Sequence, residues 1–188
     1  MNLSPDLKFD VLAAQTYPLS KWQQMTYLRI IRYKKSKGNL DVLFASSNIS
    51  VRIFAIKVIE VLGLIDQLDL LCSHYSSVTK QEKIAMVKCF QSFGFVPNSS
   101  IFFQDLNSED DELVIPIIRF FTTIGETGAV NILSKRLSME SSFPMIKAIL
   151  EFIYKTEKST YDQIISESFS EEFEAIHLHL TDPLLSHV

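Results

Sequence analysis

Residues 46–63 read SSNISVRIFAIKVIEVLG, a polar turn followed by an apolar run that ends in glycine. The apolar residues of this run keep the i, i+3, i+4, i+7, i+11 spacing of one helix face: Val51, Phe54, Ala55, Val58 and Leu62. A Ser or Asn in the turn supplies the side-chain oxygen that caps a helix, and glycine just past the last turn ends a helix in a left-handed conformation. The stretch therefore predicts one α-helix with its own start and stop signals.

The same two signals recur along the chain about 31 residues apart. Glycines close strongly apolar segments at Gly63, Gly94 and Gly125. Polar turns recur in step with them, at 46–48, 76–77, 107–108, 138–141 and 168–170. Two markers in a fixed phase indicate an internal repeat, and because strand-like alternation is nowhere sustained we expect helices throughout.

Each repeat is predicted to be a shorter first helix, a Ser-rich turn and a longer second helix. Second helices are expected over 50–62, 80–93, 110–124 and 141–155, and first helices over 39–46, 64–76, 97–106, 126–137 and 159–169. An opening pair is expected over 3–16 and 20–36, and a last helix over 171–181. The repeat phase predicts six core residues, namely Ala55, Val58, Val87, Phe90, Ile118 and Phe121.

Residues 46–63 resemble the second helix of a HEAT repeat, in which Val-Arg opens the helix and a small residue followed by Leu-Gly closes it. The likeness weakens afterwards, because Lys83 and then Val114 hold the place of Arg52. The resemblance implies a right-handed superhelix, an α-solenoid of about five to six HEAT-like hairpins, with armadillo-like packing as a related alternative. One domain over 1–188 is expected, divided into 1–38, 39–63, 64–94, 95–125, 126–155 and 156–181.

Composition places the chain among ordinary soluble domains. Its 188 residues, 47% of them hydrophobic, suffice for a core without metals or disulfides. Cys72 and Cys89 lack metal-ligand spacing and are too few for a disulfide scaffold, which favours a reducing, cytoplasmic location. Residues 1–12 do not resemble a signal peptide, and the most apolar stretch, 113–124, is interrupted and too short for a membrane span.

Charge is distributed unevenly along the chain. Residues 1–60 hold nine Lys/Arg against four Asp/Glu, whereas residues 61–188 hold nine against eighteen. Such polarity steers an acidic partner, or an anionic membrane surface, toward the N-terminal end. The overall acidity, with an isoelectric point near 5.6, argues against nucleic acid as the partner.

One basic residue per unit recurs on the second helices and the opening pair, at Arg29, Lys57, Lys88, Arg119 and Lys147. Second helices line the concave surface in HEAT-type stacks, so the resemblance implies a basic row inside a groove, which Arg32 would extend. We expect this row to bind an acidic protein or peptide. The alternative is a solvated stripe whose cations pair with carboxylates such as Glu60 or Glu151.

Four other clusters have simpler structural interpretations. The cations Arg29, Arg32, Lys34, Lys35 and Lys37 could contact phosphate or anionic lipid, but they also complement a helix dipole, which we favour. The aromatic residues Phe9, Trp22, Tyr27 and Tyr33 are expected to seal the open end of the core. The acidic run 109–112 is expected to cap a helix, and His177 and His179 point in divergent directions, without metal spacing.

No catalytic motif is present. The chain has no Gly-rich phosphate loop, no nucleophile elbow and no zinc-protease motif, and Cys89 has no neighbouring His in the sequence to activate it. We therefore expect a non-enzymatic scaffold or adaptor without cofactor, metal or small-molecule substrate. Two alternatives stay open: a HEAT-fold enzyme similar to DNA glycosylases or phycobilin lyases, and the soluble part of a membrane-associated assembly.

Overall fold

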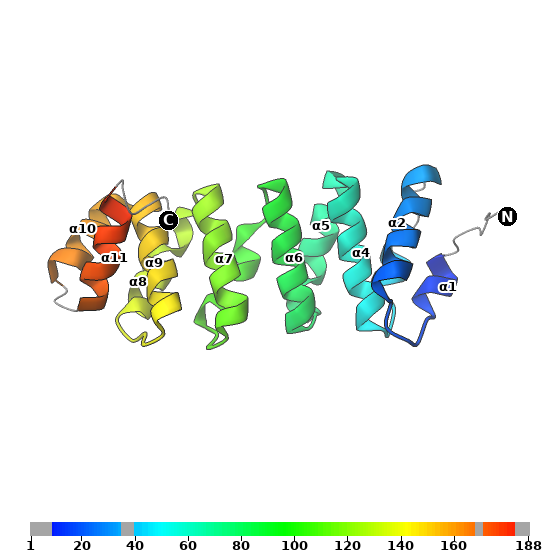
Figure 1. Ribbon diagram of the computed structural model, residues 1–188, viewed down its shortest axis with the longest axis horizontal. Coiled ribbons are helices and arrows are strands. Elements are labelled where there is room, and N and C mark those ends of the chain that lie inside the picture. The colour runs from blue at the N-terminus through cyan, green and yellow to red at the C-terminus, as the bar shows by residue number, and fades with distance from the viewer. Residues whose placement is uncertain (1–8, 35–39, 168–170, 183–188) are drawn as a thin grey trace. The chain divides into compact units, whose positions relative to one another are not determined.

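The computed structural model describes residues 9–34, 40–167 and 171–182 (Figure 1). Of these described residues, 79% are helical and none lies in a strand, which confirms the expected all-α class. Within the same ranges, no helix combines the length and apolar character that a membrane span requires. The chain divides into two compact units, Met1–Pro97 and Asn98–Val188, and each is described by itself below.

Unit 1 alternates short and long helices along the chain. Its helices are α1 (Phe9–Ala13), α2 (Lys21–Lys34), α3 (Leu40–Phe44), α4 (Ile49–Leu62), α5 (Leu68–His74) and α6 (Lys80–Phe93), and two 3-10 turns, η1 (Ile65–Gln67) and η2 (Tyr75–Ser77), flank α5. Helix α4 packs against α2 and α3 and most extensively against α6, so α2, α4 and α6 form a row within this unit (Figure 1).

In unit 2, shorter elements likewise alternate with long helices as far as α9 (Phe143–Thr156). This unit contains η3 (Ser99–Phe102), η4 (Asp105–Asn107), α7 (Asp111–Ile124), η5 (Thr127–Ala129), α8 (Val130–Leu137), α9, α10 (Lys158–Glu167) and α11 (Glu171–Thr181). Helix α9 is central and contacts α7, α8, α10 and α11. The long second helices therefore pack side by side within each unit, as expected for α4 with α6 and α7 with α9.

The prediction of a helix over 97–106 is wrong, because this segment forms the two 3-10 turns η3 and η4. A 3-10 helix aligns residues three apart, and an α-helix brings residues three or four apart onto one face, so a short apolar pattern does not separate the two geometries. Phe102 ends η3 and Leu106 lies in η4, and both side chains are fully buried.

Polar side chains cap three of the long helices, α4, α6 and α7, at their starts. Asn48 accepts a hydrogen bond from the Ser50 backbone N–H at the start of α4. Thr79 and Glu82 form a reciprocal capping box on α6. Asp110 accepts from the Glu112 N–H on α7, which confirms that the acidic run 109–112 caps a helix.

The predicted core is confirmed at all six positions. Ala55, Val58, Val87, Phe90, Ile118 and Phe121 are each fully buried. Because a helix-phase error of one residue would rotate these side chains by about 100°, their joint burial shows that the apolar spacing indicates the correct face.

Glycines end three of the long helices in the left-handed conformation, with φ of 64° at Gly63, 64° at Gly94 and 69° at Gly125. No atom lies within 4 Å of a Cβ built on Gly94. Gly94→Ala is therefore expected to cost only the backbone strain, about 1–2 kcal/mol, in the free energy of unfolding measured with urea. Ser92→Ala on the exposed side of the same helix is the control, and equal stability of the two variants would contradict the left-handed cap.

Candidate functional site

Three of the predicted basic residues occupy one position on successive helices of unit 1. Arg29, Lys57 and Lys88 are each the ninth residue of a fourteen-residue helix, on α2, α4 and α6. All three side chains are exposed. Since α4 packs against both α2 and α6, the three cations lie on adjoining helices. We call Arg29, Lys57 and Lys88 the basic row of unit 1.

Unit 2 keeps this arrangement on one helix and changes it on the next. Arg119 is the exposed ninth residue of α7, but the ninth residue of α9 is Glu151, whose carboxylate pairs with Lys155 at 3.0 Å. Lys147 is the fifth residue of α9, half-buried and one turn before Glu151 on the same face. Lys147 follows Arg119 by 28 residues, whereas α9 begins 32 residues after α7. The sequence interval alone therefore equates Lys147 with the ninth position, one turn beyond its true place in α9.

Ion pairing neutralises only part of the basic row. Lys57 Nζ lies 2.9 Å from Glu60 Oε2, an exposed contact of the kind that contributes about 0–1 kcal/mol to stability. Among the residues that the structure describes, no carboxylate forms an ion pair with Lys88 or Arg119. The alternative of a stripe neutralised by its neighbours therefore applies at Lys57 and not along the whole row.

A second row, which the search for charged residues missed, runs beside the first. The fifth residue of α2, α4 and α6 is Met25, Ile53 or Ile84, exposed or half-buried and one turn before each cation. The signal was present in the sequence as an apolar residue four positions before each cation. The solvent-facing side of unit 1 thus places apolar groups beside positive charge.

The opening helix exposes an aromatic residue that was expected to be in the core. Tyr27 is half-buried and packs edge-on against Phe54 at 6.1 Å, but Trp22 is 76% exposed, so the prediction that it seals the core is wrong. Helix α2 turns Ile31 inward, and Trp22 lies nine residues away, about two and a half turns, on the opposite side. Arg32 is exposed in the last turn, while the side chains of 33–34 and residues 35–39 lie outside the described part.

A buried ion pair links the two central helices of unit 1. Arg52 on α4 donates from Nε and Nη2 to the two carboxylate oxygens of Glu82 on α6, at 2.6 and 3.0 Å, and from Nη1 to the Ser46 carbonyl at 2.7 Å. Glu82 is fully buried and also accepts from the Thr79 hydroxyl and backbone N–H. Burial acts to raise the pKa of Glu82, but the hydrogen bonds from Arg52 and Thr79 outweigh it and lower that pKa below its ordinary value.

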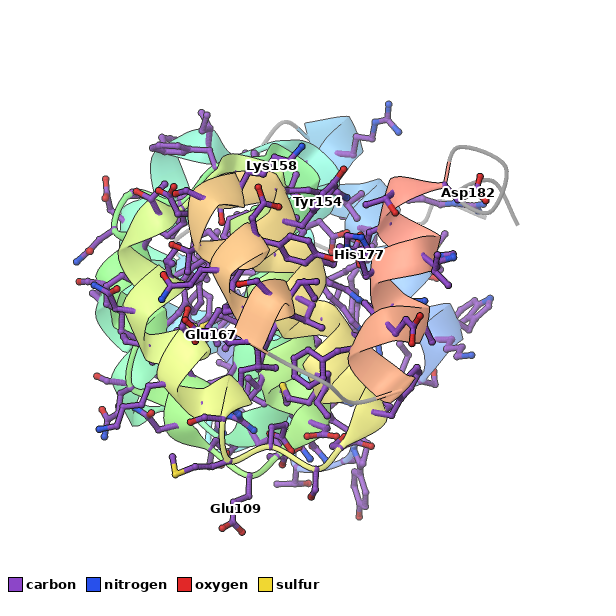
Figure 2. The ribbon with its side chains drawn as sticks, turned by 90° about the vertical axis from the view of Figure 1, so that its left-hand side faces the viewer. Glu109, Tyr154, Lys158, Glu167, His177 and Asp182 are labelled. Atoms are coloured by element: carbon purple, nitrogen blue, oxygen red, sulfur yellow. The ribbon has the colours of Figure 1, made fainter. Side chains whose placement is uncertain are left out.

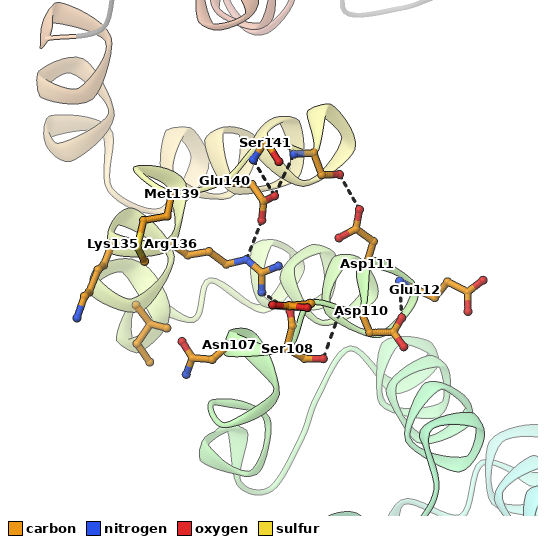
Figure 3. Close-up of a pocket in the computed structure, with 13 residues that line it drawn as sticks. Asn107, Ser108, Asp110, Asp111, Glu112, Lys135, Arg136, Met139, Glu140 and Ser141 are labelled. Atoms are coloured by element: carbon orange, nitrogen blue, oxygen red, sulfur yellow. Dashed lines mark hydrogen bonds and ion pairs between the residues drawn. The ribbon is translucent and has the colours of Figure 1, made fainter.

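The charged side chains of unit 2 meet around a hollow of about 1250 Å³ at the turns before α7 and α9 (Figure 3). Arg136 donates from Nη1 to the carbonyls of Leu106 and Ser108, at 2.5 and 2.7 Å, and from Nε to Glu140 at 3.1 Å. Glu140 also accepts from the backbone N–H groups of Ser141 and Ser142. Burial acts to raise the pKa of Glu140, and these hydrogen bonds together with Arg136 lower it overall.

Several polar side chains of this hollow hold the turns together. The Ser142 hydroxyl donates to Asp111 Oδ2 at 2.6 Å, and Asp110 caps α7 (Figure 3). A general acid or base needs a group that is available to a substrate. Because Arg136, Glu140, Asp110 and Asp111 each bond to the backbone or to a neighbouring side chain, the hollow has the chemistry of a structural junction.

The remaining candidate nucleophile and the histidine pair are part of the packing. Cys89 is fully buried, and burial, with Glu60 nearby, raises the pKa of its thiol to about 12, so it carries no thiolate at neutral pH. His177 Nδ1 lies 3.0 Å from the buried Tyr161 hydroxyl, where α11 meets α10 (Figure 2). Burial is also the main reason that the pKa of Tyr161 is raised to about 12.

Within the described ranges, no group of three or more His, Cys, Asp or Glu side chains is placed to hold a metal ion. Comparisons with models of protein families, with curated proteins and with solved structures each found no match to this chain.

Proposed function

We propose that this protein is a non-enzymatic scaffold that binds an acidic segment of another protein along the exposed side of α2, α4 and α6. The observation that carries the proposal is the recurrence of an exposed cation at the ninth position of each of these helices, Arg29, Lys57 and Lys88. Arg119 on α7 provides the same feature in unit 2.

The apolar row beside the cations supports a protein partner over a purely polyanionic one. Met25, Ile53 and Ile84 offer apolar contact next to positive charge, and a peptide with alternating acidic and apolar side chains matches both. Charged contacts at such a surface mainly raise the association rate and the salt sensitivity. Nucleic acid would need a larger basic excess than this acidic chain provides.

We further propose that the fold is a HEAT-like α-solenoid, because its turns are linked at the repeat interval. In unit 1 the Ser46 hydroxyl donates to the Ala13 carbonyl, 33 residues away, and Arg52 reaches Glu82, 30 residues away. In unit 2 Ser142 reaches Asp111, 31 residues away. Contacts repeated at one interval are typical of stacked hairpins, which present extended binding faces.

Reversing Arg29, Lys57 and Lys88 to Glu together is expected to remove partner capture from a lysate of the source cells, by at least about tenfold, because each reversal replaces attraction with repulsion. The melting temperature should change little, since exposed ion pairs are each worth about 0–1 kcal/mol. The measurement is quantitative affinity capture with the wild-type and reversed chains side by side, at low and high salt.

The matched control reverses three exposed lysines on other helices, Lys135, Lys155 and Lys158, and so makes the same change in net charge. Equal capture by the wild-type and triple-reversed chains would contradict the proposal. Competition with polyglutamate and with DNA of equal charge separates the partner classes. Displacement by DNA at the same charge concentration as polyglutamate would contradict an acidic protein as the partner.

A further inference from the structure

Two helices of this chain carry matching side-chain patterns of opposite charge. On α2, Lys21, Met25 and Arg29 are four residues apart and all exposed, with Met25 at 55%. Residues four apart lie on one helix face, so this face reads cation, apolar, cation. Trp22, beside them, adds an aromatic ring that is 76% exposed.

Helix α11 has the complementary order at the same spacing. Glu174, Leu178 and Asp182 are also four residues apart, and Leu178 is 53% exposed. The Asp182 backbone N–H donates to the Leu178 carbonyl at 2.9 Å, so the helical hydrogen bonding continues to this residue. Figure 2 shows Asp182 at the end of α11. This face therefore reads acid, apolar, acid.

Both faces are backed by packed cores. Leu28 and Ile31 hold the opposite side of α2 against unit 1. Ile176 is buried, and His177 stacks on Tyr161 at 5.9 Å, which holds α11 in unit 2. Each exposed pattern is thus presented by a helix that is already anchored, so binding requires little further ordering.

The charge of the two units favours contact between them in different molecules. Unit 1 contains twelve Lys/Arg and seven Asp/Glu, whereas unit 2 contains six and fifteen. Oppositely charged surfaces steer encounter and suppress unproductive orientations.

We propose that α2 of one chain docks against α11 of a second copy, which then competes with the acidic partner proposed above for Met25 and Arg29. The two cations of the α2 face meet the two carboxylates of the α11 face, while Met25 contacts Leu178 and Trp22 is covered. The contact joins two different surfaces, so each associated molecule keeps one unused face and assembly continues to a ring or an open chain. Trp22 with Lys21 and Arg29 would also suit an anionic lipid surface. The matched α11 pattern in the same chain favours a second copy.

The test is self-association of the full chain by analytical ultracentrifugation from about 10 µM to about 1 mM, the range of a small charged contact. The mean mass is expected to rise with concentration at about 0.05 M NaCl and to fall toward the monomer at about 1 M, where the Debye length is about 3 Å. Trp22 is the single tryptophan, so its emission should shift to shorter wavelength as the mass rises.

Charge-swap variants identify the two faces. Lys21→Glu with Arg29→Glu, and separately Glu174→Lys with Asp182→Lys, should each weaken association by at least about tenfold, because like charges then face each other. Mixing the two variants, or combining all four changes in one chain, should restore it. The control, Lys80→Glu with Lys135→Glu, equals the first variant in net charge and should associate like the wild type.

Three results would overturn the proposal. The first is a wild-type chain that stays monomeric over the whole concentration range at low salt. The second is association of the wild type that neither charge-swap variant weakens, or that mixing the two variants fails to restore. The third is a Trp22 shift that occurs with phosphatidylserine-containing vesicles but not with rising protein concentration, which would assign the α2 face to lipid instead.

Discussion

Replacing Arg52 with methionine is expected to lower the free energy of unfolding at pH 7 by about 3–5 kcal/mol, because it leaves a fully buried carboxylate without its counter-ion. Glu82 has no exposed surface, and Arg52 provides two of the four hydrogen bonds to its carboxylate. The Ser46 carbonyl also loses its guanidinium donor. Urea unfolding of the wild-type and variant chains measures the difference.

The pH dependence of the free energy of unfolding should have opposite signs in the wild type and in the Arg52→Met variant. In the wild type the pKa of Glu82 is lowered, so its contribution is present above the ordinary value of a glutamate and is lost as pH falls through the folded-state pKa. Without Arg52, burial is expected to dominate and raise the pKa of Glu82. The variant should therefore gain stability as pH falls from 7 toward about 5, whereas the wild type should not.

A double variant separates the buried charge from the packing. Adding Glu82→Met to Arg52→Met removes both ions, and replacement of a buried pair by apolar groups is often close to neutral. We expect more than half of the lost stability to return, with a residual loss of about 1 kcal/mol from the capping box. A double variant no more stable than Arg52→Met would contradict the buried ion pair.

Val58→Asp is expected to cost about 4 kcal/mol, the second large effect, because it places an unpaired carboxyl in the core of unit 1. Val58 is fully buried on α4. The folded state would favour the protonated form of the introduced carboxyl, so the loss should be greatest at neutral pH and smaller at pH 4. Thermal melts followed by the helical circular dichroism signal would record both effects.

The same helix provides the matched control. Val61 is three residues further along α4 and 47% exposed, so Val61→Asp adds the same charge without burying it. We expect its melting temperature to stay close to that of the wild type. If the two aspartate variants were equally stable, the helix phase on which the core assignment rests would be wrong.

Two arginines hold turns of the chain in different ways. Arg52 reaches the Ser46 carbonyl from the helix that follows the turn, whereas Arg136 on α8 reaches back about 30 residues to the Leu106 and Ser108 carbonyls. Both supply donors to backbone carbonyls that the helices leave unsatisfied. The sequence shows the period of these contacts, since Arg52 and Glu82 are 30 residues apart, but only the fold shows that they bond.

The sequence by itself determined the helical class, the caps of several long helices and the buried faces of α4, α6 and α7. These properties depend on groups close together in the chain: the Asn48 and Asp110 caps, the left-handed Gly63 and Gly94, and the apolar spacing around Val58. Local hydrogen bonds and side-chain periodicity are present within any one segment. They can therefore be inferred before the segments are brought together.

Tertiary structure alone decided the features that depend on distant partners. The segment 99–107 forms 3-10 turns, Lys147 lies one turn before the ninth position, and Trp22 faces solvent. The charge state of Glu82 likewise depends on Arg52 from another helix. The physical reason is common to all four. Each feature depends on which groups of other elements pack or pair with the residue, and the spacing of residues within one helix does not identify those groups.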